Sequence, residues 1–275
     1  MSNFQAFILG LVQGLAEFLP ISSSGHTTLL QMLFGINEAP EILNVLLHLG
    51  TLLVVLVVYW KRIWNMICHP IKSELKWIIL ATIPTVIAAV TIKDKLEATF
   101  GDSKYLGYCF VFTSFILLLG EAVNRLRAKK HKPVQWYDAL VMGCMQVLAI
   151  VPGVSRSGST ISGGMISGLS RRRSVDFSFL MSIPAILGSA VLGAKDIWDM
   201  SKAANVSFPV QLQALVEQLG GAVPLVIGVA TAAVSGFLAI RLMLYIVRQI
   251  GLRWFAVYTF LLGAFLIARQ VLTAA

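Results

Sequence analysis

Residues 13–26 read QGLAEFLPISSSGH, and they divide the apolar stretch Phe4–Phe34 into two halves. Proline, glycine and a run of serines disfavour one continuous helix, so the stretch predicts two short helices with a break between them. A second apolar stretch, Trp136–Leu169, is divided in the same way by residues 152–160, PGVSRSGST. Both patterns are typical of re-entrant helix pairs, because irregular backbone at membrane depth needs surrounding protein or water to satisfy its amides. An ordinary kinked span is the alternative.

The two divided stretches resemble each other when the sequence is shifted by 133 residues. Eight of eighteen positions are then identical, namely Gly10, Gln13, Leu15, Ala16, Ser22, Ser24, Gly25 and Thr27 with Gly143, Gln146, Leu148, Ala149, Ser155, Ser157, Gly158 and Thr160. Apolar identities arise easily by chance, but four polar ones in register do not. The sequence therefore predicts an internal repeat, about 1–125 and about 134–275, within a single integral membrane domain, 1–275.

The composition is that of a membrane protein. Hydrophobic residues make up 57% of the 275 residues, charged residues 13%, and the mean hydropathy is +0.80, which lies outside the range of soluble domains. A membrane span needs about 20 mostly apolar residues. Runs of about that length predict six spans, at Ile42–Trp60, Trp77–Ile92, Tyr105–Ala122, Phe177–Ala194, Pro224–Val247 and Trp254–Leu272. The amino terminus lacks a basic region and a cleavage site, so we expect no removable signal peptide.

The charged residues between the predicted spans indicate their orientation. Basic residues are in excess in 61–76, 124–132 and 171–173, and Arg248 and Arg253 lie between the last two spans. Segments 93–104 and 195–217 are nearly balanced. By the positive-inside rule the basic segments are cytoplasmic and the nearly balanced segments lie outside. The net charge of +9 therefore reflects topology, and we expect no nucleic-acid partner.

These observations together define a fold class. Each repeat holds one re-entrant pair and three spans, and three is odd, so the second repeat has the opposite orientation. We predict an all-α polytopic membrane protein with six transmembrane helices and two re-entrant helix pairs in an inverted-topology repeat. Cys68, Cys109 and Cys144 are odd in number and scattered, which argues against disulfides or a metal cluster.

The first motif carries an acid, hydroxyls and a histidine. Gln13 and Glu17 are four residues apart and share a helix face. A carboxylate inside an apolar helix is costly, so Glu17 is a candidate functional residue, and the chain after Pro20 presents three serines beside it. His26 follows these serines and has the chemistry for nucleophilic or acid–base catalysis. A hydrogen-bonded histidine of the core is the alternative. It is also our first interpretation of His48, within a predicted span, and a contact in the site or with a lipid tail is the second.

The second motif carries a cation. Arg156 at membrane depth calls for a buried anion, and its planar guanidinium suits phosphate oxygens. Glycines and hydroxyls at the start of the next helix add backbone N–H donors. The alternative is a structural ion pair between Arg156 and Glu17, which is compatible with phosphate binding. An inverted repeat brings both motifs together near the midplane.

The two motifs resemble the signatures of the undecaprenyl-pyrophosphate phosphatase family of bacitracin-resistance type, and the resemblance covers essentially the whole chain. The family's first signature has Glu or Gln four residues before an invariant Glu, as Gln13 and Glu17 do here. The resemblance implies that Glu17, Ser23, His26 and Arg156 are catalytic. It further implies substrate-binding roles for Gln13, Ser22, Ser24, Gly25, Ser155, Ser157 and Thr160.

The resemblance also implies the reaction and its setting. The reaction is hydrolysis of C55-isoprenyl pyrophosphate, undecaprenyl pyrophosphate, to the monophosphate, which recycles the carrier lipid for peptidoglycan and other envelope polymers and confers bacitracin resistance. A homodimer in membrane lipid of the bacterial inner membrane, with a site open to the periplasm, is expected. So is a divalent cation, Mg²⁺ or Ca²⁺, with Glu17 as a ligand. Two alternatives stay open, a lipid transporter or flippase of the inverted-repeat class, and His26 in place of Ser23 as the nucleophile.

Overall fold

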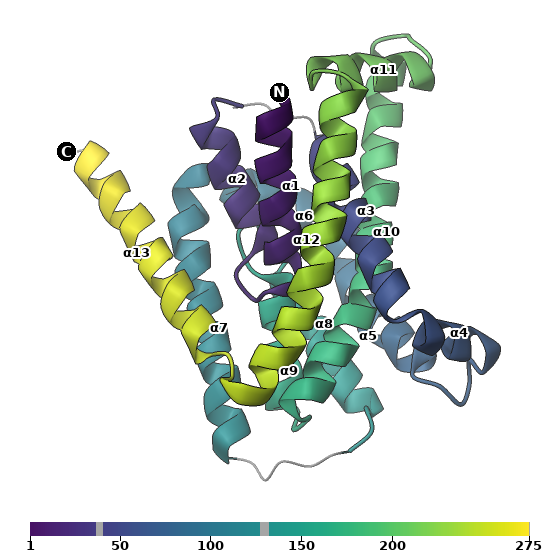
Figure 1. Ribbon diagram of the computed structural model, residues 1–275, viewed down its shortest axis with the longest axis vertical. Coiled ribbons are helices and arrows are strands. Elements are labelled where there is room, and N and C mark those ends of the chain that lie inside the picture. The colour runs from purple at the N-terminus through teal and green to yellow at the C-terminus, as the bar shows by residue number, and fades with distance from the viewer. Residues whose placement is uncertain (37–40, 127–131, 275) are drawn as a thin grey trace.

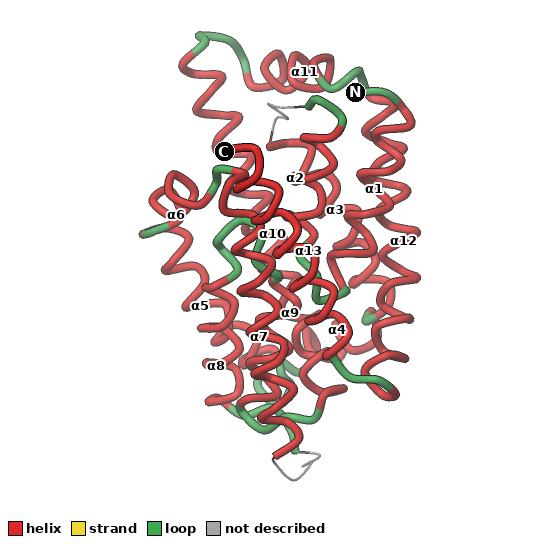
Figure 2. The backbone as a smooth tube through the Cα atoms, turned by 90° about the vertical axis from the view of Figure 1, so that its left-hand side faces the viewer, coloured by secondary structure: helices red, strands yellow, loops and turns green. Residues whose placement is uncertain are grey.

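The computed structural model describes residues 1–36, 41–126 and 132–274. Within these ranges the regular elements are all helical (Figures 1 and 2). The helices are α1 (Asn3–Phe18), α2 (Ser23–Leu33), α3 (Glu41–Val58), α4 (Trp60–Cys68), α5 (Leu75–Thr91), α6 (Lys93–Phe100), the short 3₁₀ helix η1 (Ser103–Tyr105), α7 (Leu106–Leu126), α8 (Trp136–Leu148), α9 (Arg156–Ile166), α10 (Arg171–Ala203), α11 (Phe208–Gln218), α12 (Ala222–Gln249) and α13 (Arg253–Ala274). Much of the basic loop at 124–132 lies outside the described residues.

The long apolar helices confirm a multi-spanning membrane protein. Four helical segments are long and apolar enough to cross a membrane: η1 with α7, then α10, α12 and α13. The count rises to six if two bent pairs are each one span. In these pairs α3 meets α4 at 75° and α5 meets α6 at 67°. The described residues thus contain a helix for each of the six predicted spans, although two of those helices reach span length only together with a bent neighbour.

Both polar motifs interrupt helices, as predicted. The first break, residues 19–22, separates α1 from α2, and the second break, residues 149–155, separates α8 from α9. The same hydroxyl begins the second helix of each pair. Ser22 Oγ accepts a hydrogen bond from the backbone N–H of Gly25 (3.2 Å), and Ser155 Oγ accepts one from Gly158 (3.0 Å). These are N-caps, which satisfy amides that a helix start leaves unpaired.

The first helix of each pair packs tightly against a long partner. Helix α1 lies along α12, and α8 lies along α5 (Figure 1). A Cβ on Gly10 would lie 2.2 Å from the carbonyl oxygen of Gly228, and a Cβ on Gly143 would lie 2.3 Å from that of Ala81. Small residues at such positions let helices approach closely, the usual means of association in a membrane. Gly10 and Gly143 are in register in the repeat, so the two halves share this packing.

Two features of the fold exceed the prediction. Helix α10 has 33 residues and extends past both ends of the expected span 177–194. Helix α11 was not predicted, and it lies across one end of the molecule, next to the ends of α10 and α12 (Figure 1). Its apolar side, with Leu215 buried, covers a small core near the amino terminus. The segment is too short to span a bilayer, so hydropathy did not single it out.

The charged residues near span ends form ion pairs. Glu121 pairs with Arg171, and Glu74 pairs with both Arg62 and Arg173. The ammonium of Lys132 lies 2.8 Å from the carboxylate of Asp138. Burial disfavours the charged form of Lys132, but hydrogen bonds to Asp138 and its neighbouring tyrosine outweigh burial and raise the pKa of the ammonium. The acids near these span ends are therefore paired with basic residues of adjoining segments.

Candidate active site at the meeting of the two breaks

Glu17, in the last turn of α1, is the centre of a buried polar cluster. It is 5% exposed, and one carboxylate oxygen, Oε1, accepts a hydrogen bond from Arg156 Nη2 at 2.6 Å. The other oxygen, Oε2, accepts bonds from Ser23 Oγ at 2.7 Å and from Gln13 Nε2 at 3.1 Å. His48 Nδ1 lies 3.1 Å from the same oxygen. A buried carboxylate is costly without such partners, so the cluster holds Glu17 in place.

Arg156 links the second break to the first. It is the first residue of α9, and its Nη1 donates to the backbone carbonyl of Ser178 on α10 at 3.3 Å. The ion pair with Glu17 confirms the contact predicted as an alternative for Arg156. A guanidinium has five N–H donors, and two are accounted for by these bonds. Because the side chain also lines a cavity, it is positioned to meet an anion there.

Several predicted substrate-binding residues form hydrogen bonds that join the two breaks or the helices beside them. Ser157 Oγ donates to the carbonyl of Leu19 at 3.1 Å, and the backbone N–H of Gly153 donates to Ser24 Oγ at 3.3 Å. Thr160 bonds to Ser178 Oγ at 2.6 Å. Together with the capping bonds of Ser22 and Ser155, these contacts hold the backbone in position. Figure 1 shows the breaks in the middle of the molecule, with helices on either side.

His26 and Ser23 have hydrogen-bond partners on different helices. The Nδ1 atom of His26 lies 2.7 Å from the carbonyl oxygen of Ser22, and its Nε2 lies 2.7 Å from the hydroxyl of Tyr258 on α13. A carbonyl can only accept, so Nδ1 carries the proton, and in the neutral ring Nε2 accepts from Tyr258. The ring stacks on Tyr258 and meets the edge of Phe110, with centroids 5.7 and 5.1 Å apart.

Ser23 and His26 are three residues apart on α2, and they bond to different partners. The two residues are neighbours along α2, but the serine hydroxyl bonds to a buried carboxylate on α1, that of Glu17, and the histidine bonds to a tyrosine on α13, Tyr258. In this structure the partner nearest the Ser23 hydroxyl is therefore a carboxylate.

A cavity of about 640 Å³ opens beside the cluster. Its polar lining includes four side chains near the breaks: Ser24, His48, Gln146 and Arg156. Its apolar lining comes mainly from α5 and α10. Gln146 is in register with Gln13; its amide nitrogen bonds to Thr85 Oγ1 at 3.0 Å, and its amide oxygen has no hydrogen-bond partner among the described residues. The cavity is the space in which a charged group would reach Arg156.

Sequence reasoning favoured another interpretation for one residue of the site and missed a second residue. For His48 a structural interpretation came first, yet its ring lies against both Glu17 and Gln13, 2.9 Å from the amide of the latter. A titratable side chain inside an apolar span was the available signal. Tyr258 offered no such signal, because tyrosine is common in membrane helices, and its contact with His26 joins residues 232 positions apart.

The side chains that the structure describes do not form a dedicated metal cage. Among the described residues, no group of three or more His, Cys, Asp or Glu side chains is placed to hold an ion. Glu17 already accepts hydrogen bonds on both oxygens, one of them from a guanidinium. Mg²⁺ and Ca²⁺ take six or more oxygen ligands. A cation at this site would need most of its ligands from substrate and water.

The fold and the site define an integral membrane protein in which two broken helices bring a buried carboxylate and an arginine together beside a cavity. The chain belongs to the family of the bacitracin resistance protein BacA, whose model matches residues 6–265. This confirms the resemblance predicted from the two serine-rich motifs.

Several relatives are similar over nearly their whole length. A protein of Carboxydothermus hydrogenoformans is 41% identical over 270 residues, which cover 98% of both chains. One of Halothermothrix orenii is 37% identical over 271 residues, covering 97% of this chain and 98% of the relative. One of Alkaliphilus metalliredigens is 35% identical over 292 residues, covering 99% of this chain and 100% of the relative. All three are named undecaprenyl-diphosphatase.

Proposed function

We propose that this chain hydrolyses undecaprenyl pyrophosphate to undecaprenyl phosphate and phosphate, and so recycles the carrier lipid of cell-envelope polymers. The observation that carries the proposal is the hydrogen-bonded chain from Ser23 through Glu17 to Arg156 at 2.7 and 2.6 Å. It combines a hydroxyl, a base and a phosphate-binding cation in one buried cluster. The family and the names of its near full-length relatives agree with that chemistry.

The geometry suggests how the residues act. The terminal phosphate enters the cavity and binds Arg156, which loosens the pair with Glu17. Glu17 then accepts the proton of Ser23 as the hydroxyl oxygen attacks the terminal phosphorus and the bridging P–O bond breaks. Undecaprenyl phosphate leaves. Water then attacks the phosphorus of the phosphoserine, the bond from phosphorus to Oγ breaks, Glu17 returns its proton to Oγ, and the phosphate keeps the protons of the water. His26 would serve as acid–base partner once its bond to Tyr258 opens, or would attack phosphorus itself, which is the alternative nucleophile.

Phosphate release by the purified protein in detergent tests the proposal. We expect phosphate from undecaprenyl pyrophosphate in proportion to enzyme, and about 10²–10⁴-fold slower release from the Glu17→Gln variant. A lipid transporter or flippase would release no phosphate, and that result would overturn the proposal. The same assay with a chelator tests the divalent cation, Mg²⁺ or Ca²⁺, which the resemblance alone implies. Glu17 would be its protein ligand, and the ion would neutralise charge on the pyrophosphate.

We propose the inverted-topology arrangement of six spans and two re-entrant pairs in a bacterial inner membrane, with the site open to the periplasm. The shared packing of Gly10 and Gly143 and the equivalent caps of Ser22 and Ser155 support it. In a background without native cysteines, a cysteine at Lys202 is expected to react with a membrane-impermeant reagent added outside intact cells. A cysteine at Lys72 is expected to be protected. Outside labelling of the latter would contradict the arrangement.

A homodimer follows from the resemblance and remains a proposal. Chemical cross-linking in native membranes, followed by gel electrophoresis, would show a species of twice the monomer mass. Cross-linking that yields monomer alone at every reagent concentration would contradict it.

A further inference from the structure

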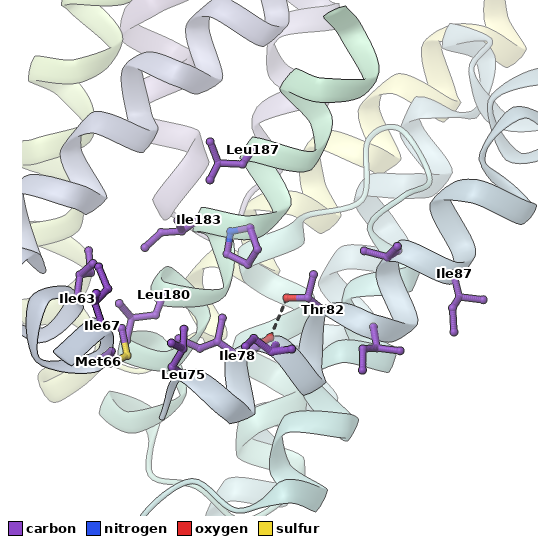
Figure 3. Close-up of a pocket in the computed structure, with 14 residues that line it drawn as sticks. Ile63, Met66, Ile67, Leu75, Ile78, Thr82, Ile87, Leu180, Ile183 and Leu187 are labelled. Atoms are coloured by element: carbon purple, nitrogen blue, oxygen red, sulfur yellow. Dashed lines mark hydrogen bonds between the residues drawn. The ribbon is translucent and has the colours of Figure 1, made fainter. Parts of the chain in front are cut away.

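A second hollow lies on the surface of the molecule between α4, α5 and α10 (Figure 3). We call it the apolar groove; its volume is about 530 Å³, and its lining includes Ile67, Ile79, Ile83, Leu180 and Leu187. The lining is apolar except for Thr82, whose hydroxyl donates to the carbonyl of Ile78 at 2.8 Å and so is already paired. The groove therefore offers contacts to hydrocarbon and little else.

The apolar groove adjoins the cavity beside Arg156. Thr82, Val86 and Pro184 line both. The combined path has a cationic end, where the cavity meets Arg156, and an entirely apolar end toward α4. A ligand that fits both ends must join an anionic group to a long hydrocarbon chain.

We propose that the apolar groove binds the isoprenoid chain of the lipid pyrophosphate while the pyrophosphate lies at Arg156. This rests on the proposed function and adds to it a site for chain length. A phospholipid acyl chain would match the groove alone, because its headgroup stays at the membrane surface and not beside a buried arginine. The volume also falls within the range of about 300–1,000 Å³ that is usual for ligand pockets.

Two substitutions that narrow the groove test the proposal. Ile83 and Leu187 line the groove and are each 47% exposed. A larger side chain at either position can therefore be accommodated without preventing the protein from folding. We expect Ile83→Trp and Leu187→Trp to raise KM for undecaprenyl pyrophosphate by about tenfold, as loss of a few buried methylene groups would. For farnesyl pyrophosphate, whose chain is much shorter, KM is expected to stay within about twofold, since little of that chain reaches the groove.

Leu238→Trp is the matched control. This leucine is 58% exposed on α12 and lines neither hollow, so KM for both substrates should be unchanged. An equal rise in KM for the long and the short substrate in the groove variants would overturn the proposal. So would an unchanged KM for undecaprenyl pyrophosphate.

A direct measurement separates this inference from the proposed function. A polyprenyl pyrophosphate with a benzophenone at the far end of its chain is irradiated with the purified protein, and the labelled peptides are mapped. We expect labels on α4, α5 and α10 that excess undecaprenyl phosphate prevents. Equal labelling of α7, α12 and α13, or labelling that the competitor does not prevent, would show ordinary lipid contact. Either result would overturn the proposal that the groove binds the isoprenoid chain. If the wild type releases no phosphate from either substrate, the proposed function fails, and the labelling still decides the groove.

Discussion

The two breaks share a scaffold and differ in chemistry. In both, a serine caps the second helix, at 3.2 Å for Ser22 and 3.0 Å for Ser155. In both, a threonine hydroxyl donates to the carbonyl four residues earlier, at 3.0 Å for Thr27 and 2.9 Å for Thr160. Both pairs of residues are identical in the repeat, and the two members of each pair make the same kind of hydrogen bond.

The positions with candidate chemistry are the ones at which the two breaks differ. In register, Glu17 corresponds to Ile150, Ser23 to Arg156, and His26 to Ser159. The acid and the hydroxyl thus flank the first break, and the cation directly follows the second. The site exists only where the two breaks meet. The comparison teaches that the serines and threonines shared by the two halves fix the backbone, whereas the candidate catalytic residues stand where the halves differ.

The largest effect is expected at Ser23. We expect Ser23→Ala to reduce phosphate release to background, because the attacking oxygen is lost. Ser162→Ala is the control, since it removes a buried hydroxyl of α9 that has no hydrogen-bond partner among the described residues. Single-turnover trapping with labelled substrate should yield an acid-stable phosphoserine in the wild type. An acid-labile, base-stable phosphoenzyme retained in Ser23→Ala would assign the attack to His26, and no intermediate at all would favour direct attack by water.

The next effect is expected at the acid. Glu17→Gln keeps the shape and the contact with Arg156 but removes the base, so turnover should fall by about 10²–10⁴-fold. Its counterpart in the repeat provides the contrast, because Ile150→Val alters an apolar cavity wall and should change turnover by less than about threefold. Steady-state phosphate release measures both. Similar losses of turnover in the two variants would mean that positions at which the repeats differ are not specifically the catalytic ones.

The cation comes third. Arg156→Lys retains the charge opposite Glu17 but loses the planar fork, so we expect a loss of turnover of about 10²–10³-fold with folding preserved. Size-exclusion elution and helical circular dichroism verify the fold. Arg172→Lys, in a weak exposed pair with Asp176 at 3.9 Å, is the control and should retain full turnover. Near-native turnover of Arg156→Lys would refute the role of the guanidinium fork.

Much of this site could be predicted from the sequence, for physical reasons. Glu17 and Arg156 were identifiable because charge is costly at membrane depth, and their contact followed from the repeat. The breaks were identifiable because proline, glycine and serine interrupt helices. The direction in which a side chain turns was not, because Ser23 and His26 share one short helix and find partners on α1 and α13. Such partners come from packing between helices that lie far apart in the sequence.

A smaller effect is expected at Tyr258. Its hydroxyl holds Nε2 of His26, so Tyr258→Phe should free that nitrogen while keeping the stacked ring. We expect turnover to change by less than about tenfold, because one neutral hydrogen bond contributes about 1 kcal/mol. Nitrogen NMR of labelled histidine provides a second readout, in which the Nε2 signal of His26 should shift as its acceptor bond is lost. An unchanged signal would show that the bond does not exist in the membrane-extracted protein.

The smallest effects concern the caps, and they compare the breaks most closely. Ser22→Ala and Ser155→Ala each remove one capping acceptor, so each should destabilise the protein by about 1 kcal/mol. Thermal unfolding in detergent, followed by tryptophan fluorescence, measures the change in Tm. Equal shifts are expected, because both hydroxyls accept from an amide three residues ahead. A loss at one cap alone would show that the two breaks do not share a scaffold.

Glycine at the same two positions separates the cap from the backbone. Ser22 has φ of 71°, in the left-handed region that costs a residue with a Cβ of order 1 kcal/mol, whereas Ser155 has φ of −71°. Glycine is itself preferred over alanine at an N-cap by roughly 0.5–1 kcal/mol, so each glycine variant should have a Tm above that of the matching alanine variant. Ser22→Gly also relieves the backbone cost, so its stability gap over Ser22→Ala should exceed the gap of Ser155→Gly over Ser155→Ala by about 1 kcal/mol. Equal gaps at the two positions would mean that the first break carries no backbone strain. The larger gap expected at Ser22 would place that strain next to the serine that bonds to Glu17, and would leave the helix start at Arg156 relaxed.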